Sequence, residues 1–323
     1  MFKRKVLITG ATGFVGANIL RFLVKKNYSP HVLIRKTSNL WRIKDLVPKI
    51  ALYQIDLLEK KLLEKTVKKI KPQIIFHLAN AALYQGLPTF VKSYIEVNIL
   101  GTINLITACK DLNYQCFINT GSSAEYGSKE RPMKEDNFCQ PLSLYAVTKL
   151  AATNYASYVG KKEKKPIITL RLFSPFGPYD DPKRLITEVI YHALKNNNIY
   201  LSNPDLVRDY IFIDDVVRAY ILAIEAAEKY PGEIFNLGSG KESSIKKVAE
   251  TILGLIDSSS TIKWGVFPPR DFESSKWQAD LNKTKKFLKF KPEVSFEDGL
   301  EKTIAWFKKN IPIYEGRVRM FRN

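Results

Sequence analysis

The chain has 323 residues, of which 45% are hydrophobic and 26% are charged, and this is the composition of a globular protein of about two domains. Its three cysteines form no C-x-x-C pair and no run of about 18 apolar residues occurs, which excludes a disulfide scaffold, a cysteine zinc site and a membrane span. The 51 basic and 32 acidic residues give a net charge of +19, which attracts anions.

The basic residues are spread along the chain, in pairs such as Lys60-Lys61 and Lys308-Lys309. No zinc-finger, RRM or basic-zipper pattern accompanies them, so we expect phosphorylated metabolites rather than a specific nucleic acid as partners. No metal site and no membrane partner are predicted. Glycines interrupt the apolar stretch that follows the basic N-terminus, so we expect no export signal and a cytoplasmic protein.

Short apolar runs alternate with helical patterns through the first half of the chain. Strands are predicted at residues 5–9, 31–35, 50–53, 74–78, 115–120 and 167–172, and helices at residues 18–26, 62–70, 90–112 and 144–160. This alternation predicts an α/β fold with a doubly wound, mostly parallel sheet of the Rossmann type. After Pro175 the pattern becomes irregular, and residues 210–213, 216–229 and 234–237 are expected to return to the sheet.

Two domains that exchange segments are therefore predicted. Residues 1–174 and 207–238 are expected to form the dinucleotide-binding domain. Residues 175–206 and 239–323 are expected to form a smaller, mixed α/β domain that binds the substrate.

A glycine-rich loop lies between the first predicted strand and the first helix. Gly10, Gly13 and Gly16 follow the spacing G-x-x-G-x-x-G. Glycine allows a tight turn and a close approach of the backbone to a pyrophosphate, and the helix N-terminus offers free N–H groups to its oxygens. The loop predicts dinucleotide binding.

The end of the second predicted strand carries a basic residue. Arg35 and Lys36 stand there, and no Asp or Glu occurs from Arg35 to Lys44. An acid at this place binds the ribose 2′-hydroxyl of NAD, whereas an arginine suits the 2′-phosphate of NADP. We therefore expect NADP(H) to be favoured over NAD(H).

Tyr145 and Lys149 stand at positions i and i+4 of a predicted helix, so they share one face. The pKa of a free tyrosine is about 10, and a neighbouring ammonium group lowers it. Such a tyrosine can deliver a proton to a developing alkoxide, as the reduction of a carbonyl requires. The pair therefore predicts an oxidoreductase site.

Together, these motifs resemble the extended short-chain dehydrogenase/reductase family, in its NAD-dependent epimerase/dehydratase branch. Further segments carry the resemblance: Asp56-Leu57, the stretch from His77 to Ala81, and Asn98 with Gly101-Thr102. The resemblance implies that the cofactor is bound by Gly10, Thr12, Gly13, Phe14, Val15, Gly16, Arg35, Lys36, Asp56, Leu57, Leu78, Ala79, Asn80, Asn98, Thr120, Tyr145, Lys149 and Phe173.

The third catalytic residue that the resemblance implies is a hydroxyl four residues before the tyrosine of a Tyr-Gly pair. Counting back from Tyr126 gives Ser122, with Ser123 as the alternative if the loop shifts by one residue. The expected catalytic set is therefore Ser122, Tyr145 and Lys149.

A nucleotide-diphosphate sugar is the substrate that the resemblance implies. The expected substrate-binding residues are Ser122, Ser123, Tyr145, Ser174, Arg184, Arg208 and Arg270. The two arginines Arg208 and Arg270 match family positions that bind the diphosphate, and a planar guanidinium can bind phosphate oxygens at two points. Ser174 replaces the asparagine usual at that position.

Departures from the family pattern narrow the reaction. Dehydratases carry an Asp-Glu pair directly after the catalytic hydroxyl, where Ser123 and Ala124 stand here. The loop of residues 121–127 and the short gap to Tyr145 resemble those of reductases that act on nucleotide-bound 4-keto-6-deoxyhexoses. This resemblance implies an NADPH-dependent reductase that acts on the C4 ketone of a nucleotide-activated 4-keto-6-deoxyhexose in deoxysugar (cell-surface polysaccharide) biosynthesis. The alternatives are a 4-epimerase with a recycled cofactor and a catalytically silent protein that binds sugar nucleotides or RNA. The resemblance also implies a homodimer through helices 90–112 and 144–160.

Overall fold

A computed structural model of the chain describes residues 4–81, 91–267 and 276–318. A parallel sheet of seven strands lies at its centre, with the order β10-β6-β5-β4-β1-β2-β3. The strands are β1 (Lys5–Thr9), β2 (Ser29–Ile34), β3 (Ala51–Gln54), β4 (Ile74–His77), β5 (Cys116–Ser122), β6 (Ile167–Leu172) and β10 (Ile234–Leu237). The predicted fold class is confirmed.

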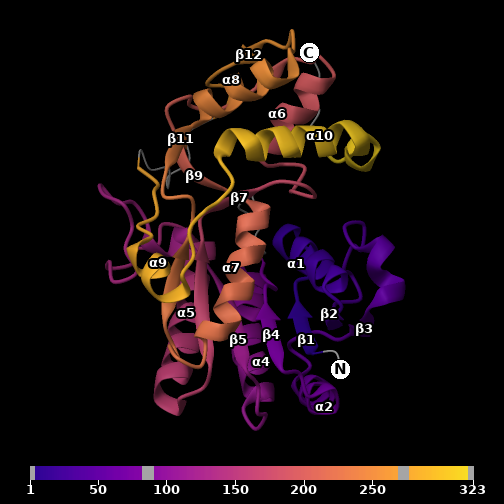
Figure 1. Cartoon of the computed structure of the whole chain (residues 1–323), viewed down its shortest axis with the longest axis vertical. Helices are drawn as coiled ribbons and strands as arrows, with labels where there is room; N and C mark the ends of the chain where they lie inside the picture. The colour runs from indigo at the N-terminus through magenta and orange to yellow at the C-terminus, as the bar shows by residue number, and fades with distance from the viewer. Residues whose placement is uncertain (1–3, 82–90, 268–275, 319–323) are drawn as a thin grey trace.

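Helices cover both faces of this sheet, which is why its strands are almost continuously apolar. All residues of β4 and β6 are buried. Helices α1 (Phe14–Lys25) and α7 (Ile213–Ala226) pack together on one face, and α2 (Lys60–Ile70), α4 (Gly101–Cys109) and α5 (Leu144–Glu163) cover the other. Figure 1 shows the sheet in the lower half of the molecule with these helices around it.

The long helix predicted at 90–112 is interrupted. The described part begins with α3 (Val91–Tyr94), passes through the π-helical turn η3 (Ile95–Leu100) and continues as α4. Residue 90 lies outside the described residues. Such π-helical turns are common at functional sites, and this one contains the predicted site residue Asn98.

The expected return of residues 210–213 to the main sheet is wrong. Strand β9 (Val207–Phe212) lies in a separate sheet between β7 (Ser174–Phe176) and β11 (Glu242–Ser244). Its aromatic side chains explain this placement, because Tyr210 and Phe212 pack against Phe176, with ring centroids 6.4 and 5.7 Å apart. The residue after this strand begins α7, and β10 then takes the place beside β6.

Helices from the second half of the chain form a layer at the top of Figure 1. The irregular sequence pattern after Pro175 did not predict these helices. Helices α6 (Leu185–Leu194), α8 (Ile245–Ile256) and α10 (Phe296–Tyr314) pack on one another, beside the short pair β8 (Ile199–Tyr200) and β12 (Ile262–Lys263). Helix α9 (Asn282–Leu288) returns to pack against β10 and α7. The short helices η1 (Lys44–Lys49) and η4 (Ser123–Tyr126) complete the fold.

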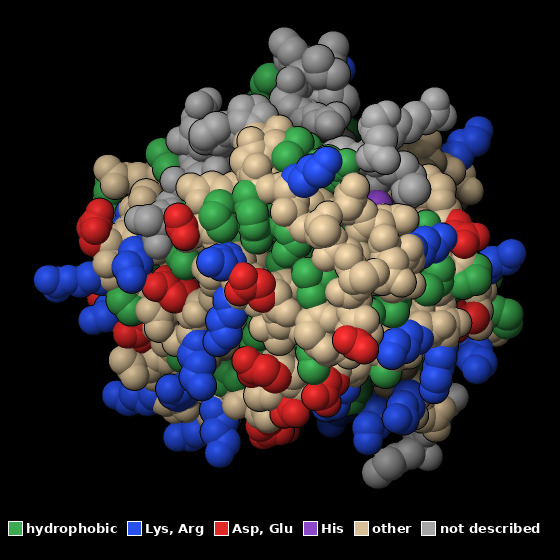
Figure 2. Space-filling view, turned by 90° about the horizontal axis from the view of Figure 1, so that it is seen from above, with side chains coloured by type: hydrophobic (Ala, Val, Ile, Leu, Met, Phe, Trp, Pro, Cys, Tyr) green, Lys and Arg blue, Asp and Glu red, His purple; other side chains and the backbone are tan. Residues whose placement is uncertain are grey.

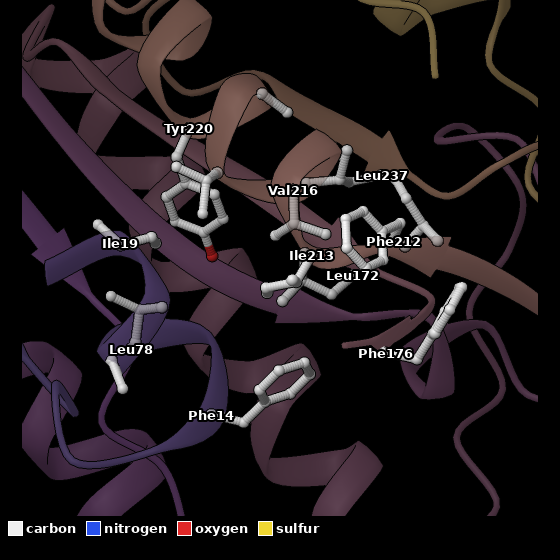
Figure 3. Packing of buried hydrophobic residues seen from close by; sticks show 14 of the residues in the cluster. Phe14, Ile19, Leu78, Leu172, Phe176, Phe212, Ile213, Val216, Tyr220 and Leu237 are labelled. Carbon is white, nitrogen blue, oxygen red and sulfur yellow. The ribbon is translucent and has the colours of Figure 1, made fainter. Parts of the chain in front are cut away.

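One buried cluster joins the large sheet to the small one. Phe14 at the start of α1, Leu172 at the end of β6, and Phe176, Phe212 and Ile213 all belong to it, as Figure 3 shows. The carboxyl ends of the parallel strands therefore face the small sheet and the helical layer across a continuous core. Ligands of doubly wound folds bind at this edge.

Two further observations concern possible partners. No helix in the described ranges is both long and apolar enough to span a membrane. On the face shown in Figure 2, Lys and Arg side chains lie mostly along the rim and in the lower part, with Asp and Glu side chains between them.

Candidate active site

The glycine loop has the geometry of a phosphate cradle. Gly10 has φ of +72°, and a Cβ atom there would lie 2.4 Å from the carbonyl carbon of Leu78. A Cβ atom on Gly16 would lie 2.3 Å from the carbonyl oxygen of Gly10. Gly13 caps α1 without using a side chain, so the first N–H groups of that helix remain available for an anion. The loop therefore fits the diphosphate of a dinucleotide.

A cleft of about 350 Å³ opens beside this loop, at the ends of β1, β2 and β4. The predicted cofactor residues that line it are Gly10, Thr12, Gly13, Arg35, Asp56, Leu57, Leu78, Ala79 and Asn80. The cleft lining does not include Phe14, Val15, Gly16, Lys36, Asn98, Thr120, Tyr145, Lys149 or Phe173. The cleft therefore joins the glycine loop to the carboxyl ends of β2 and β4, which is where doubly wound folds bind nucleotides.

The basic end of the cleft is built by the turn after β2. The N–H of Arg35 donates to the hydroxyl of Ser38 at 3.0 Å, and both residues line the cleft. The carboxylates in the lining are Asp56 and Glu96, which come from other segments. Arg35 therefore belongs to the wall of the cleft, at the end of β2.

Arg42 is a cleft residue that the sequence analysis missed. Its guanidinium donates to the carbonyl oxygens of Thr12 at 3.3 Å and Tyr179 at 2.7 Å, and it lies 4.2 Å from the Trp41 ring. It therefore ties the glycine loop to the segment that leads into α6. No local pattern could have revealed this role, because both acceptors are distant in sequence.

A buried polar layer supports the cleft floor. His77 bonds Thr9 at 2.7 Å and Thr102 at 2.9 Å, and burial, with the charge of Lys149, lowers the pKa of His77 to about 3. Asn98 accepts from the N–H of Ala81 at 2.7 Å and donates to the hydroxyl of Thr148 at 3.0 Å. His77 and Asn98 thus hold the segment after β4 against α4 and α5.

Helix α5 presents the predicted tyrosine and lysine. It begins at the N-cap Ser143, whose hydroxyl accepts from the N–H of Ala146, so Tyr145 lies in its first turn. The ammonium of Lys149 donates to the carbonyl oxygen of Thr120 at the end of β5. Burial lowers the pKa of Lys149 to about 8, and the charge of Glu125 opposes this shift.

The two candidate serines differ in their contacts. Ser122 ends β5 and is half-buried, and its oxygen accepts from the N–H of Ala124, which leaves its hydrogen available to a ligand. Ser123 is buried, and its hydroxyl accepts from the indole N–H of Trp277 at 3.0 Å. The geometry therefore favours Ser122 for contact with a substrate oxygen.

Glu125 is the carboxylate closest in sequence to these serines, and its contacts point into the protein. It is fully buried and forms an ion pair with Arg171 at 2.7 Å. It also accepts from the N–H of Ser122 at 2.8 Å and from the hydroxyl of Thr153 at 3.0 Å. Glu125 therefore does not take the role of the Asp-Glu pair of dehydratases, whose two positions are occupied here by Ser123 and Ala124.

Two of the predicted substrate arginines, Arg208 and Arg184, lie within the described residues. The guanidinium of Arg208 lies 5.0 Å from the Trp277 ring, and Arg184 caps α6 and pairs with Asp180 at 3.2 Å. Burial raises the pKa of Tyr210 to about 12, and the charges of Arg208 and Arg184 oppose that rise.

Ser174, Phe173 and Arg270 are the remaining predicted residues. Ser174 begins β7 and pairs with Tyr210 in the small sheet. Phe173 is buried with Tyr126 and Met133 in a hydrophobic cluster rather than in the cofactor cleft. Arg270 lies outside the described residues. Within the described ranges, no cluster of His, Cys, Asp and Glu side chains could hold a metal ion.

The sheet order, the glycine loop and the cleft define a Rossmann-type dinucleotide-binding protein. A sequence model of the "NAD dependent epimerase/dehydratase family" matches residues 6–238, and the chain belongs to this family.

Similar proteins include both curated relatives and solved structures. UDP-glucuronate 4-epimerase of Thermodesulfobacterium geofontis is 29% identical, with 95% of this chain and 97% of that protein covered. An epimerase structure from Methanothermobacter thermautotrophicus has a TM-score of 0.88 at 27% identity, covering 98% of this chain and 96% of that one. UDP-glucuronic acid 4-epimerase of Bacillus cereus, in complex with NAD and UDP-glucuronic acid, has a TM-score of 0.85 at 27% identity, covering 95% and 99%.

Proposed function

We propose that the protein reduces the C4 ketone of a nucleotide-activated 4-keto-6-deoxyhexose with NADPH, in deoxysugar biosynthesis. The observation that carries this proposal is the cation at position 35 in the cofactor cleft, where no residue from 35 to 44 is acidic. A cofactor held by its 2′-phosphate suits a reductase that exchanges it with a pool, by analogy within such folds.

The chain's own residues supply the proton chemistry. Tyr145 delivers the proton to the oxygen that develops negative charge, and Lys149, one turn along α5, stabilises the phenolate that remains. Ser122 donates a hydrogen bond to the same oxygen. A nicotinamide cofactor in the cleft would supply the hydride.

Dehydration is disfavoured because its acid and base are missing. Elimination requires one group to protonate the leaving hydroxyl and another to remove a carbon-bound proton. Ser123 and Ala124 have no carboxyl group, and Glu125 is held by Arg171 and Thr153.

We expect Arg35→Ala to remove most of the preference for NADPH. A charge-assisted hydrogen bond contributes about 1.5–3 kcal/mol, so the wild type should bind NADPH roughly ten- to a hundredfold more tightly than NADH. Titration of both cofactors against the wild type and Arg35→Ala measures this, with the exposed Arg131→Ala as the control. Equal affinity of the wild type for both cofactors would contradict the proposal.

Arg208 on β9 and Arg184 at the N-cap of α6 support the choice of a nucleotide diphosphate as substrate, since guanidinium groups bind phosphate oxygens. Arg208→Ala should weaken binding of the nucleotide sugar by the same 1.5–3 kcal/mol and leave NADPH binding unchanged. Calorimetric titration with CDP-, GDP-, dTDP- and UDP-sugars identifies the ligand, and Arg4→Ala, before β1 at the opposite edge of the sheet, is the matched control. Unchanged affinity in Arg208→Ala would place the diphosphate elsewhere.

A second candidate is a nucleotide-sugar 4-epimerase. The names of the relatives favour it, since UDP-glucuronate 4-epimerases match nearly the whole chain. The same serine, tyrosine and lysine would serve an oxidation followed by reduction on the other face of the sugar. Net consumption of NADPH separates the two reactions.

We also propose a homodimer through the helices of residues 90–112 and 144–160. Large apolar side chains are exposed on η3 and its neighbours, namely Val91, Ile95 and Leu100, and on α5, namely Val147 and Tyr158. These helices pack beside one another, so two copies would form a four-helix interface. Sedimentation equilibrium tests this arrangement, and a monomer at micromolar concentration would contradict it.

A further inference from the structure

A buried ion pair lies under the proposed catalytic group. The side chains of Glu125 and Arg171 are 0% and 2% exposed, and their N–O distance is 2.7 Å. A buried pair of charges is often no more stabilising than apolar residues of the same size. A role beyond stability is therefore worth seeking in what else the two side chains contact.

Glu125 anchors the loop that carries Ser122. Its Oε1 accepts from the N–H of Ser122 at 2.8 Å, while the Ser122 hydroxyl accepts from the N–H of Ala124, which together form a capping box around η4. Gly121 makes room for this arrangement, because a Cβ atom there would lie 2.9 Å from the same Oε1. The position of Ser122 therefore depends on the Glu125 carboxylate.

The same carboxylate reaches α5 below Lys149. Thr153 donates to Glu125 Oε1 at 3.0 Å, and Thr153 stands one turn after Lys149 on the same helix face. Lys149 is buried and donates to Thr120 on β5. The carboxylate is thus close enough to Lys149 to influence its charge.

Within the described residues, the charged or titratable groups near Lys149 stand on β4, β6, α5 itself and α7, where Tyr220 bonds the Thr120 hydroxyl. His77 on β4 is neutral, because burial lowers its pKa to about 3, and Tyr145 lies on the same helix. On β6, Arg171 is paired with Glu125. Burial lowers the pKa of Lys149 to about 8, and the charge of Glu125 opposes this.

We propose that Glu125 is a positioning residue of the active site, whose buried carboxylate fixes the Ser122 loop and faces Lys149 with a negative charge, with Arg171 as its counter-ion. This inference rests on the proposed carbonyl reduction. The reaction needs the Lys149 ammonium beside the proton donor Tyr145. Removing the nearby negative charge of Glu125 makes loss of the Lys149 proton easier, so the active form should disappear at lower pH.

The test is the pH–rate profile of three variants. In Glu125→Gln the high-pH limb of kcat should move down by on the order of one pH unit. In Thr153→Val, which loses one hydrogen bond to Glu125 but keeps the charge, the limb should stay in place. In Glu125→Asp the charge remains but the anchor is shortened, so kcat should fall about tenfold with the limb unmoved and NADPH affinity retained.

These outcomes differ from those of a merely structural residue. Such a residue would lower the melting temperature of each variant without moving the limb or lowering the kcat of the folded enzyme. An unmoved limb in Glu125→Gln overturns the charge role, and an unchanged kcat in Glu125→Asp overturns the anchor role. The kcat of Glu125→Asp can be measured even if Glu125→Gln does not fold.

A measurement without substrate separates this inference from the proposed function. Burial lowers the pKa of Lys149 to about 8 in the folded protein, so Lys149 is charged below that pH and neutral above it. The Glu125 carboxylate attracts Lys149 only while Lys149 is charged, so this stabilisation is present at pH 6 and lost at pH 9. Glu125→Gln should therefore destabilise the protein more at pH 6 than at pH 9, and this difference should vanish in a Lys149→Met background. Equal destabilisation at both pH values overturns the coupling, whereas absence of carbonyl turnover in the wild type overturns the proposed function alone.

Discussion

Replacement of Tyr145 by phenylalanine is expected to lower the rate of carbonyl reduction by about 10²–10⁴-fold. Only the hydroxyl is removed, so the ring keeps its edge contact with Tyr94, whose centroid lies 6.5 Å away. Lys149 keeps its bond to Thr120, because that bond does not involve the tyrosine. Binding of NADPH and of the nucleotide sugar should therefore stay within a few-fold of the wild type.

The control for this variant lies on the same helix. Tyr158 on α5 is 61% exposed, so Tyr158→Phe removes a hydroxyl without touching the site and should retain full activity. Initial rates at saturating NADPH, with thermal shifts as the binding readout, compare the two variants. Retention of more than about a tenth of the wild-type rate by Tyr145→Phe would assign the proton transfer to another group.

Arg171→Met is expected to lower the free energy of unfolding by about 3–5 kcal/mol. The substitution places an unbranched apolar side chain in the space of the arginine, and it leaves the Glu125 carboxylate buried without its counter-ion. Removing one partner of a buried pair is far more damaging than removing both, because the remaining charge has no water to solvate it. Urea-induced unfolding at neutral pH measures the loss.

An exposed ion pair serves as the matched comparison. Lys246 and Glu250 are 4.0 Å apart on α8, and both side chains are more than half exposed. Lys246→Met should change the free energy of unfolding by less than about 1 kcal/mol. Similar losses in both variants would show that burial of the Glu125–Arg171 pair does not govern its contribution.

The central sheet could be predicted from the sequence because its signals are local. Strands such as β1 and β4 are short apolar runs between loops, and they lie where the pattern placed them. The sheet that a strand joins depends on distant segments rather than on its own sequence, and this explains the error at β9. The run Tyr-Ile-Phe-Ile is equally apolar in either sheet, and only its distant partners in β7 and β11 decide.

The lysine-rich C-terminal helices were missed for a related reason. Helix α10 contains Pro312 and a non-helical Asn310, so its local pattern is interrupted. Its early residues pack against distant parts of the chain, since Gly299 lies against Phe176 and Phe212. Such packing stabilises a helix that the local sequence favours only weakly.

The candidate site also has one part that local sequence motifs predict and another part that depends on contacts between distant residues. The glycine loop and the Tyr145–Lys149 spacing are local motifs, and the structure places them on a strand-to-helix turn and on one helix, as predicted. Arg42 and Glu125 were not recognised, because each acquires its role from partners far along the chain. A glutamate before Tyr126 reads as an ordinary polar loop residue until Arg171 is seen beside it.

The most direct test of the proposed function follows deuterium from NADPH labelled at the transferred position. The proposal predicts that one NADPH is consumed for each sugar reduced, that the label is found at C4 of the product, and that no solvent hydrogen enters C3 or C5. Mass spectrometry and NMR of the product determine all three. Conversion of a nucleotide hexose to its C4 epimer without net loss of NADPH would contradict the proposal and establish the epimerase instead.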